Sequence, residues 1–252
     1  MFHFFDKYAD PRVQDYFLMK SPWQLVLTLV LYFTFVLKVG PSLMKNRKSW
    51  NLTLILIIYN LLQIIANGFA FHKYLKIIPV LNFMCTPVDK SNSPTSMAVV
   101  QIHYDYTLLK FFDLLDTVFF VLRKKNSQIT FLHLHHHSGM LVSTWISGKY
   151  FPGGHALFVG FLNTFVHVVM YSYYLMTAWS SEGWKNVWWK KYLTQLQIAQ
   201  HAFISVTFLA QLVNPSCTYP KELSGLFLVT AVWMTAQFCQ FYVKSYIKCN
   251  KL

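Results

Sequence analysis

Long apolar stretches dominate this chain and constrain its fold more than any other feature of the sequence. Seven of them are long enough to cross a bilayer as helices, which takes about 20 residues. They cover residues 23–43, 50–72, 98–122, 129–148, 155–179, 192–213 and 223–243. Because 55% of the residues are hydrophobic and only 12% are charged, we expect an all-α polytopic membrane protein with seven transmembrane helices.

The chain reads as a single membrane domain over residues 1–252, because no repeat or polar module divides it. Residues 1–22 lack a basic region and a small-residue cleavage site, so the first span is expected to be a retained helix. With a lumenal N-terminus, the C-terminus and the basic loops 45–48, 123–125 and 185–191 face the cytoplasm, as the positive-inside rule favours. The net charge of +13 therefore indicates membrane topology and contact with lipid, and no nucleic-acid partner.

The longest break between spans, residues 73–97, contains Cys85, and the break before the last span contains Cys217. Both breaks fall on the non-cytoplasmic side. If that side is the lumen of the secretory pathway, a disulfide between Cys85 and Cys217 joins the two loops. The alternative is two unpaired thiols, because sequence does not set connectivity.

Ionisable side chains inside the spans are the most informative feature for function, because each is costly in a bilayer unless it faces protein or water. In the third span, Lys110, Asp113 and Thr117 share one helical face, with Asp116 beside them. Lys110 and Asp113 are spaced to pair. They either neutralise each other inside the bundle or contribute to a site.

Three further spans carry polar groups on one face. The fourth begins with an HxxHH pattern, the fifth carries a stripe with Tyr173 to its side, and the sixth opens with amides that either bond between helices or line a site. The residues are His133, His136 and His137; Asn163 and His167; Thr194 and Gln197. Counted from the cytoplasmic ends, most of these groups and Asp116 fall in one layer about 6–18 Å deep. A shared depth across four helices favours a functional site over polar packing.

Basic side chains precede two of these helices. Arg123 and Lys125 lie before the histidine helix, with Gln128 nearby, and Lys190 lies before the sixth span. This basic rim suits a polyanionic ligand that enters from the cytoplasm. Positive-inside topology explains each cluster equally well.

The histidine cluster leaves two kinds of chemistry open, metal binding and covalent or acid–base catalysis. A di-iron oxygenase needs about eight histidines in several boxes. The chain has ten histidines but only one box, so we expect no metal site. A seven-helix receptor or transporter is a further alternative, in which the polar layer binds a ligand or proton.

Four motifs resemble those of the ELO family, the elongases of very-long-chain fatty acids, and the resemblance runs from the first span to the last. They are KFFDLLDT from Lys110, HLHHH from His133, the segment from Asn163 through HVVMYSYY, and TQLQIAQ from Thr194. One departure is Asp113, where the family usually has Glu, so the pairing with Lys110 is in question. Another is the tail, which lacks a di-lysine retrieval signal.

The resemblance implies an acyltransferase, a 3-oxoacyl-CoA synthase that condenses long-chain acyl-CoA with malonyl-CoA and releases CO₂ and CoA. His136 would form an acyl-imidazole, with His137 as the second choice, and His133, His167, Asn163 and Gln197 would contact the developing oxyanion. Asp116 would orient an imidazole. CoA phosphates would bind Arg123, Lys125 and Lys190, with Gln128 nearby, and Lys110 with its neighbour Asp113, Tyr173 and Thr194 would lie along the chain or pantetheine.

The resemblance also implies residence in the endoplasmic reticulum membrane, no cofactor, self-association, and contact with the other enzymes of the elongation cycle. The sequence does not identify the preferred acyl chain.

Overall fold

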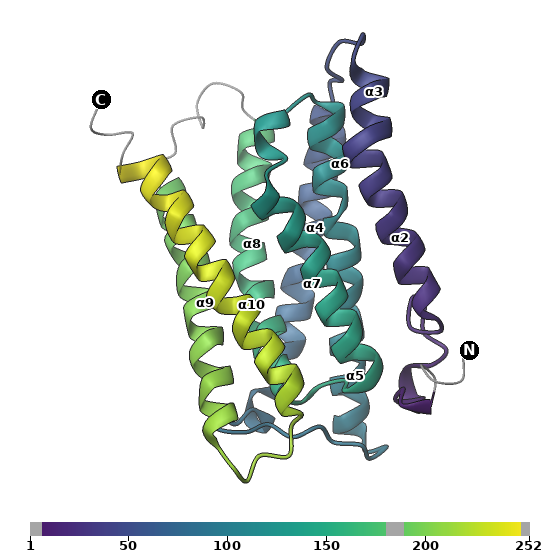
Figure 1. Cartoon of the computed structure of the whole chain (residues 1–252), viewed down its shortest axis with the longest axis vertical. Coiled ribbons are helices and arrows are strands. Elements are labelled where there is room, and N and C mark those ends of the chain that lie inside the picture. Colours follow the sequence, from purple (N-terminus) through teal and green to yellow (C-terminus); the bar gives the residue numbers. More distant parts are fainter. Residues whose placement is uncertain (1–6, 180–188, 248–252) are drawn as a thin grey trace. The chain divides into compact units, whose positions relative to one another are not determined.

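The computed structural model describes residues 7–179 and 189–247, and every regular element in these ranges is helical. The chain divides into two compact units, Met1–Thr53 with Asn92–Pro152, and Leu54–Ser91 with Gly153–Leu252. The first unit contains α2 (Pro22–Thr34), α3 (Gly40–Met44), α5 (Pro94–Asp113), α6 (Leu115–Leu122) and α7 (Phe131–Tyr150) (Figure 1). The second contains α4 (Thr53–Ile77), α8 (Leu157–Trp179), α9 (Lys190–Val213) and α10 (Lys221–Tyr242). The single membrane domain over residues 1–252 stays a prediction.

Within residues 7–179 and 189–247, five helical stretches are long and apolar enough to cross a membrane. They are Pro22–Met44, Thr53–Val80, Gly154–Trp179, Lys190–Val213 and Lys221–Ile247. The protein is therefore a multi-pass membrane protein. Helices α5 with α6, and α7, correspond to the third and fourth predicted spans, but their charged and imidazole side chains lower their hydropathy. The count of seven spans and the lumenal N-terminus stay predictions.

The first span continues past Lys38, through a π-helical turn at Phe35–Val39 into α3. Pro41 has no N–H for the carbonyl four residues earlier, and the helix widens at this point instead of ending. Gly40 allows α3 to approach α6 closely, because a Cβ at this position would lie 2.6 Å from Val121 Cγ1.

The segment before the first span packs against the C-terminal end of α7. Trp145 Nε1 donates to Leu18 O at 2.7 Å, and the buried Lys149 Nζ donates to Met19 O at 2.7 Å. The backbone N–H of Asp10 donates to Lys149 O at 2.8 Å. These three hydrogen bonds hold the segment that leads to α2 against α7.

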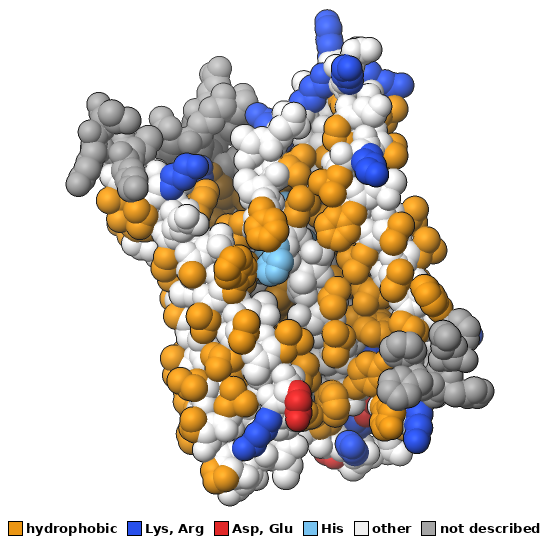
Figure 2. Space-filling view, viewed as in Figure 1, with side chains coloured by type: hydrophobic (Ala, Val, Ile, Leu, Met, Phe, Trp, Pro, Cys, Tyr) orange, Lys and Arg blue, Asp and Glu red, His pale blue; other side chains and the backbone are white. Residues whose placement is uncertain are grey.

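In the second unit, α4 extends to Ile77, beyond the predicted end at residue 72, so the loop that follows is shorter than expected. Aromatic rings join α4 to α8, with Phe71 stacked on Phe161 at 5.4 Å between ring centroids. Gly160 makes room for the buried Tyr74, whose hydroxyl occupies the space that a Cβ at this position would need. Hydrophobic side chains cover the sides of α9 and α10, where lipid would lie (Figure 2).

One end of the second unit is held by a disulfide between Cys85 and Cys217. Asn214 Nδ2 also donates to Met84 O at 3.3 Å. Next to Cys217, Tyr219 is almost completely buried, and this burial raises the pKa of its hydroxyl. Its ring occupies the space that a side chain at Gly154 would need, and Gly154 has a φ of +60°.

Candidate functional site

The candidate site residues divide between the two units. The third and fourth predicted spans, α5 with α6 and α7, belong to the first unit, and α8 and α9 belong to the second. Each group is therefore described within its own unit.

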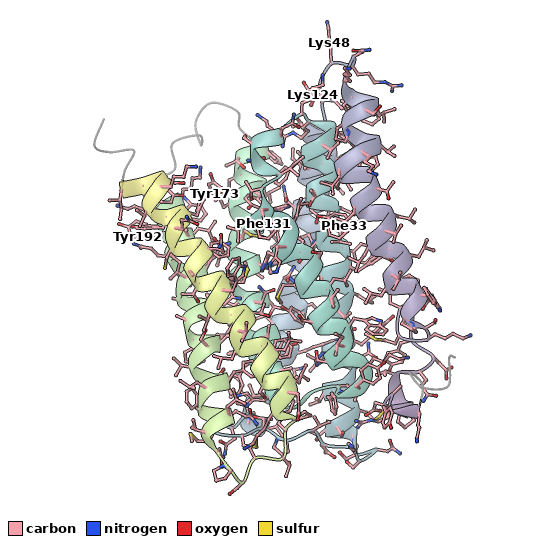
Figure 3. The ribbon with its side chains drawn as sticks, in the orientation of Figure 1. Phe33, Lys48, Lys124, Phe131, Tyr173 and Tyr192 are labelled. Atoms are coloured by element: carbon pink, nitrogen blue, oxygen red, sulfur yellow. A yellow bond between two sulfur atoms is a disulfide. The ribbon has the colours of Figure 1, made fainter. Side chains whose placement is uncertain are left out.

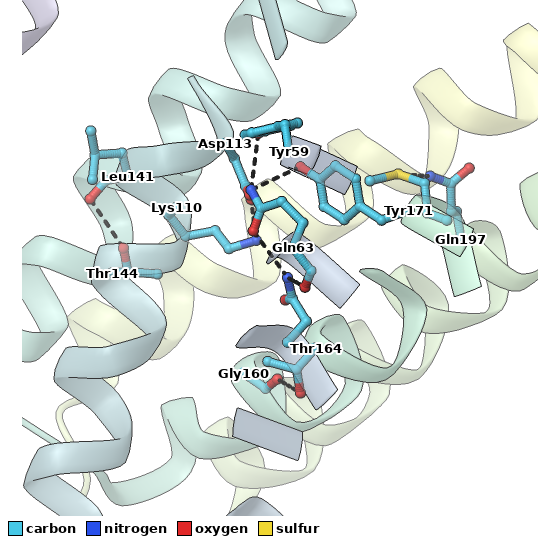
Figure 4. Close-up of polar contacts among 12 residues, drawn as sticks. Tyr59, Gln63, Lys110, Asp113, Leu141, Thr144, Gly160, Thr164, Tyr171 and Gln197 are labelled. Atoms are coloured by element: carbon cyan, nitrogen blue, oxygen red, sulfur yellow. Dashed lines mark hydrogen bonds and ion pairs between the residues drawn. The ribbon is translucent and has the colours of Figure 1, made fainter. Parts of the chain in front are cut away.

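The ion pair in question forms. Lys110 Nζ lies 2.6 Å from Asp113 Oδ2, and both residues are 2% exposed (Figure 4). The predicted third span is not one continuous helix, because α5 ends at Asp113 and α6 begins at Leu115. Asp116, on the first turn of α6, is also buried. The shorter side chain of Asp therefore reaches Lys110, and the first unit holds a compact charged cluster at this break.

The HxxHH helix gathers three imidazole rings. Thr130 caps α7 by accepting a bond from His133 N at 3.2 Å. From this start, the ring of His133 lies 4.2 Å from that of His137, and the ring of His136 lies 5.6 Å from that of His137. His135 instead stacks on Phe131, at 5.6 Å. The ring of His135 therefore lies apart from the rings of His133, His136 and His137.

The histidine group differs in accessibility. His137 is 8% exposed, whereas His136 and His133 are half-buried. His136 is therefore the more exposed residue of the two, although its Nδ1 atom is buried. His133 also bonds to α6, because its Nε2 lies 2.9 Å from Thr117 Oγ1 on that helix.

Basic loops gather at the end of the first unit next to these histidines. Lys124 Nζ donates to Lys45 O at 3.4 Å, and Trp50 N donates to Leu122 O at 3.1 Å, so loops 45–50 and 123–125 are joined. Figure 3 shows Lys48 and Lys124 at this common end. The candidate phosphate contacts Lys125 and Gln128 are exposed and Arg123 is half-buried.

In the second unit, His167 and Tyr171 on α8 lie side by side, with their rings 5.5 Å apart. The hydroxyl of Tyr171 accepts a bond from Gln63 Nε2 on α4 at 3.4 Å. Gln197 on α9 reaches the same helix, where its Nε2 lies 3.8 Å from Met170 Sδ (Figure 4). Asn163 is buried one turn before His167. Three helices therefore contribute polar groups to this cluster.

The remaining candidates of the second unit lie towards the start of α9. The ring of Tyr173 packs on Trp189 at 5.4 Å, and Thr194 Oγ1 lies 3.4 Å from Tyr246 Oη. Lys190 is exposed at the start of α9. The loop residue Lys185 and the tail from Lys248 lie outside the described residues.

Two sets of polar residues were not predicted from the sequence. One is Tyr32 on α2, whose hydroxyl lies 2.8 Å from Thr117 Oγ1. The other is an amide stripe on α4, formed by the buried Asn60, Gln63 and Asn67. The stripe had a signal in the sequence, because amides at i, i+3 and i+7 of an apolar span share one face. Tyr32 had none, since a single tyrosine in an apolar span is ordinary.

Within the part of the chain that the structure describes, no three His, Cys, Asp or Glu side chains are grouped so that they could hold a metal ion. The absence of a metal site stays an expectation.

The first unit thus joins a buried ion pair to a histidine box, and the second joins a histidine to amides and tyrosines, all on helices of a membrane protein. A family model described as ELO, the GNS1/SUR4 family, matches residues 17–252. The chain belongs to this family.

Relatives from insects and mammals agree with the family match. A very long chain fatty acid elongase of Aedes aegypti is 44% identical over 251 residues, which cover 98% of this chain and 69% of the relative. Very long chain fatty acid elongase 4 of Homo sapiens is 39% identical, covering 96% of this chain and 77% of the relative. Very long chain fatty acid elongase 1 of Mus musculus is 36% identical, covering 100% of this chain and 91% of the relative.

Proposed function

We propose that this protein is a very-long-chain 3-oxoacyl-CoA synthase, an acyltransferase that catalyses the condensing step of fatty acid elongation. It joins a long-chain acyl-CoA to malonyl-CoA and forms 3-oxoacyl-CoA, CO₂ and CoA. The observation that carries the proposal is the histidine group of α7, in a chain that belongs to the elongase family. One member of this group, His133, bonds to Thr117 on α6, the helix that carries the buried Asp116.

The first half-reaction transfers the acyl group to His136. A neutral imidazole nitrogen attacks the thioester carbonyl, the C–S bond breaks, and the CoA thiolate leaves and takes a proton from water, while the acylated ring keeps the proton on its other nitrogen. His136 suits this role better than His137 because it is half-buried, whereas His137 is 8% exposed. The reacting carbonyl must reach the nucleophile, and His136 is the more exposed residue of the two; because its Nδ1 is buried, Nε2 is the attacking nitrogen.

The second half-reaction forms the new carbon–carbon bond. Malonyl-CoA loses CO₂, and the resulting enolate attacks the acyl-imidazole carbonyl, which releases the neutral His136. Negative charge develops on oxygen in this step, so hydrogen-bond donors lower its barrier. We assign these contacts to His133, Asn163, His167 and Gln197, and the orientation of an imidazole to Asp116.

The outer contacts follow from charge and exposure. The CoA phosphates would bind Arg123, Lys125 and Lys190, with Gln128 beside them, because these side chains are accessible and mostly basic. Tyr173, Thr194, and Lys110 with its partner Asp113, would lie along the pantetheine or acyl chain. The chemistry requires no cofactor.

We further place the protein in the membrane of the endoplasmic reticulum, as a self-associating partner of the enzymes that complete the elongation cycle. Family membership supports this assignment.

Intact-protein mass spectrometry tests the covalent step. Purified wild type and His136→Ala are incubated with a long-chain acyl-CoA in the absence of malonyl-CoA. We expect wild type to gain the mass of the acyl group and His136→Ala to gain none. His135→Ala is the matched control, because this ring stacks on Phe131, and it should still acquire the adduct.

Adding malonyl-CoA should then discharge the adduct as 3-oxoacyl-CoA with release of CO₂. An adduct on His136→Ala but not on His137→Ala would move the nucleophile to His137. No adduct and no malonyl-dependent CO₂ release in wild type would overturn the proposal, and bound iron or zinc in that preparation would favour a metal enzyme.

A further inference from the structure

A chain of hydrogen bonds in the first unit runs from the first membrane span to the histidine box. Tyr32 Oη on α2 lies 2.8 Å from Thr117 Oγ1 on α6, and Thr117 Oγ1 lies 2.9 Å from His133 Nε2 on α7. Figure 3 labels Phe33, which follows Tyr32 in the sequence, and Phe131, which lies two residues before His133. Three helices thus meet through one threonine hydroxyl.

The residues that form this chain of hydrogen bonds are largely buried. Thr117 is 0% exposed and Tyr32 is 6% exposed, although most side chains of α2 are not buried. The ring of Phe120, one turn after Thr117 on α6, packs on His133 with 5.1 Å between centroids. A buried phenol needs a partner, and in this unit that partner is a residue which also bonds a histidine of the motif.

The direction of the two bonds follows from counting hydrogens. Among the described residues, the Tyr32 hydroxyl has Thr117 as its one hydrogen-bond partner. A hydroxyl has a single hydrogen, so a buried Tyr32 satisfies its donor by donating to Thr117. In the described ranges, the Thr117 hydroxyl has no acceptor for its own hydrogen other than His133 Nε2, so Thr117 donates to that nitrogen. The reverse direction would leave the phenol hydrogen buried without an acceptor, which is unfavourable.

An imidazole nitrogen that accepts a hydrogen bond carries no proton. In the neutral ring the proton therefore lies on Nδ1 of His133. This tautomer makes Nδ1 a donor, which is the property required of a group that contacts a developing oxyanion. The opposite tautomer would present a lone pair to that oxygen and repel it.

We propose that Tyr32 is a positioning residue that acts through Thr117 to hold His133 in the tautomer protonated at Nδ1. The inference rests on the proposed function and extends it to the first span, which carries none of the family motifs. Tyr32 does not touch the reacting atoms in this scheme. Its effect is on the ring that His133 offers to the oxyanion.

The test is a double-mutant cycle on the full-length protein, with rates of 3-oxoacyl-CoA formation from a long-chain acyl-CoA and malonyl-CoA. The variants are Tyr32→Phe, Thr117→Val and their combination, with Thr117→Ser as the conservative variant. Tyr16→Phe is the matched control, because it removes another bonded phenol of the same unit, 3.2 Å from Gln101 Oε1.

We expect Tyr32→Phe to lower kcat about fivefold, the effect of one hydrogen bond, with little change in KM. Thr117→Val should lower kcat at least as much, and adding Tyr32→Phe to it should cause no further loss, because the chain is already broken. Thr117→Ser should stay near the wild-type rate, as should Tyr16→Phe. Thr117→Ser keeps the hydroxyl and so also shows whether any loss reflects packing alone.

Three results would overturn the inference while the proposed function stands. They are a wild-type rate for Tyr32→Phe, equal losses from Tyr32→Phe in the Thr117→Val and wild-type backgrounds, or a Thr117→Ser variant as slow as Thr117→Val. If wild type forms no malonyl-dependent product, the proposed function itself is overturned, and the role of Tyr32 with it.

Discussion

Breaking the buried Lys110–Asp113 pair will decide whether it only stabilises the first unit or also serves the reaction. The side chains are 3% and 2% exposed and 2.6 Å apart. Removing one partner, as in Lys110→Met or Asp113→Val, leaves the other charge buried without it. Such a change costs about 3–5 kcal/mol of folding free energy. For a chain of this size that loss lowers the Tm by about 10 °C.

The double variant Lys110→Met/Asp113→Val removes both charges together. Because apolar replacement of a whole buried pair is often neutral for stability, we expect its Tm to return close to the wild-type value. Its elongation rate should stay at least about tenfold below wild type, about 1.4 kcal/mol in the barrier. Stability and activity therefore separate in this variant if the pair serves the reaction.

Thermal unfolding in detergent and malonyl-dependent product formation are measured on the same preparations. Asp113→Glu is the control, since it keeps the charge and restores the residue usual in the resembling motif; it should retain both stability and activity. A double variant with wild-type rate would show that the pair is purely structural. Single variants that melt within about 2 °C of wild type would refute the claim that these charges depend on each other.

Two further predictions concern the second unit. Replacing Cys85 and Cys217 by Ser opens a covalent link between residues 132 apart, so thermal unfolding should show a loss of about 2–5 kcal/mol; unchanged melting, with or without reductant, would contradict this. Gly160→Ala should destabilise the protein by about 1–3 kcal/mol, because its Cβ would lie 2.5 Å from Tyr74 Cζ. Gly225→Ala is the control for melting, since nothing lies within 4 Å of its Cβ, and equal effects of the two changes would refute the packing argument.

The sequence alone determined the helical class and the positions of most helices. Apolar runs in a bilayer must satisfy their own backbone hydrogen bonds, and a helix does this within one segment. The helical period also grouped His133, His136 and His137 on one face and left His135 off it, because the angle between two side chains around the axis of a helix depends only on their spacing in the sequence. The ends were less certain, as the extension of α4 to Ile77 and the break at Leu114 show.

The tertiary structure decided which faces meet. Periodicity places Thr117 on the same face as Lys110, but it does not say that Tyr32 and His133 bond to its hydroxyl from two other helices. The amides Gln63 and Asn67 likewise acquire meaning only from α8, where Tyr171 accepts a bond from Gln63. Contacts between helices depend on rotation and depth of both partners, which no single span encodes. The sequence therefore identifies the histidines, and the fold shows what holds His133 in place.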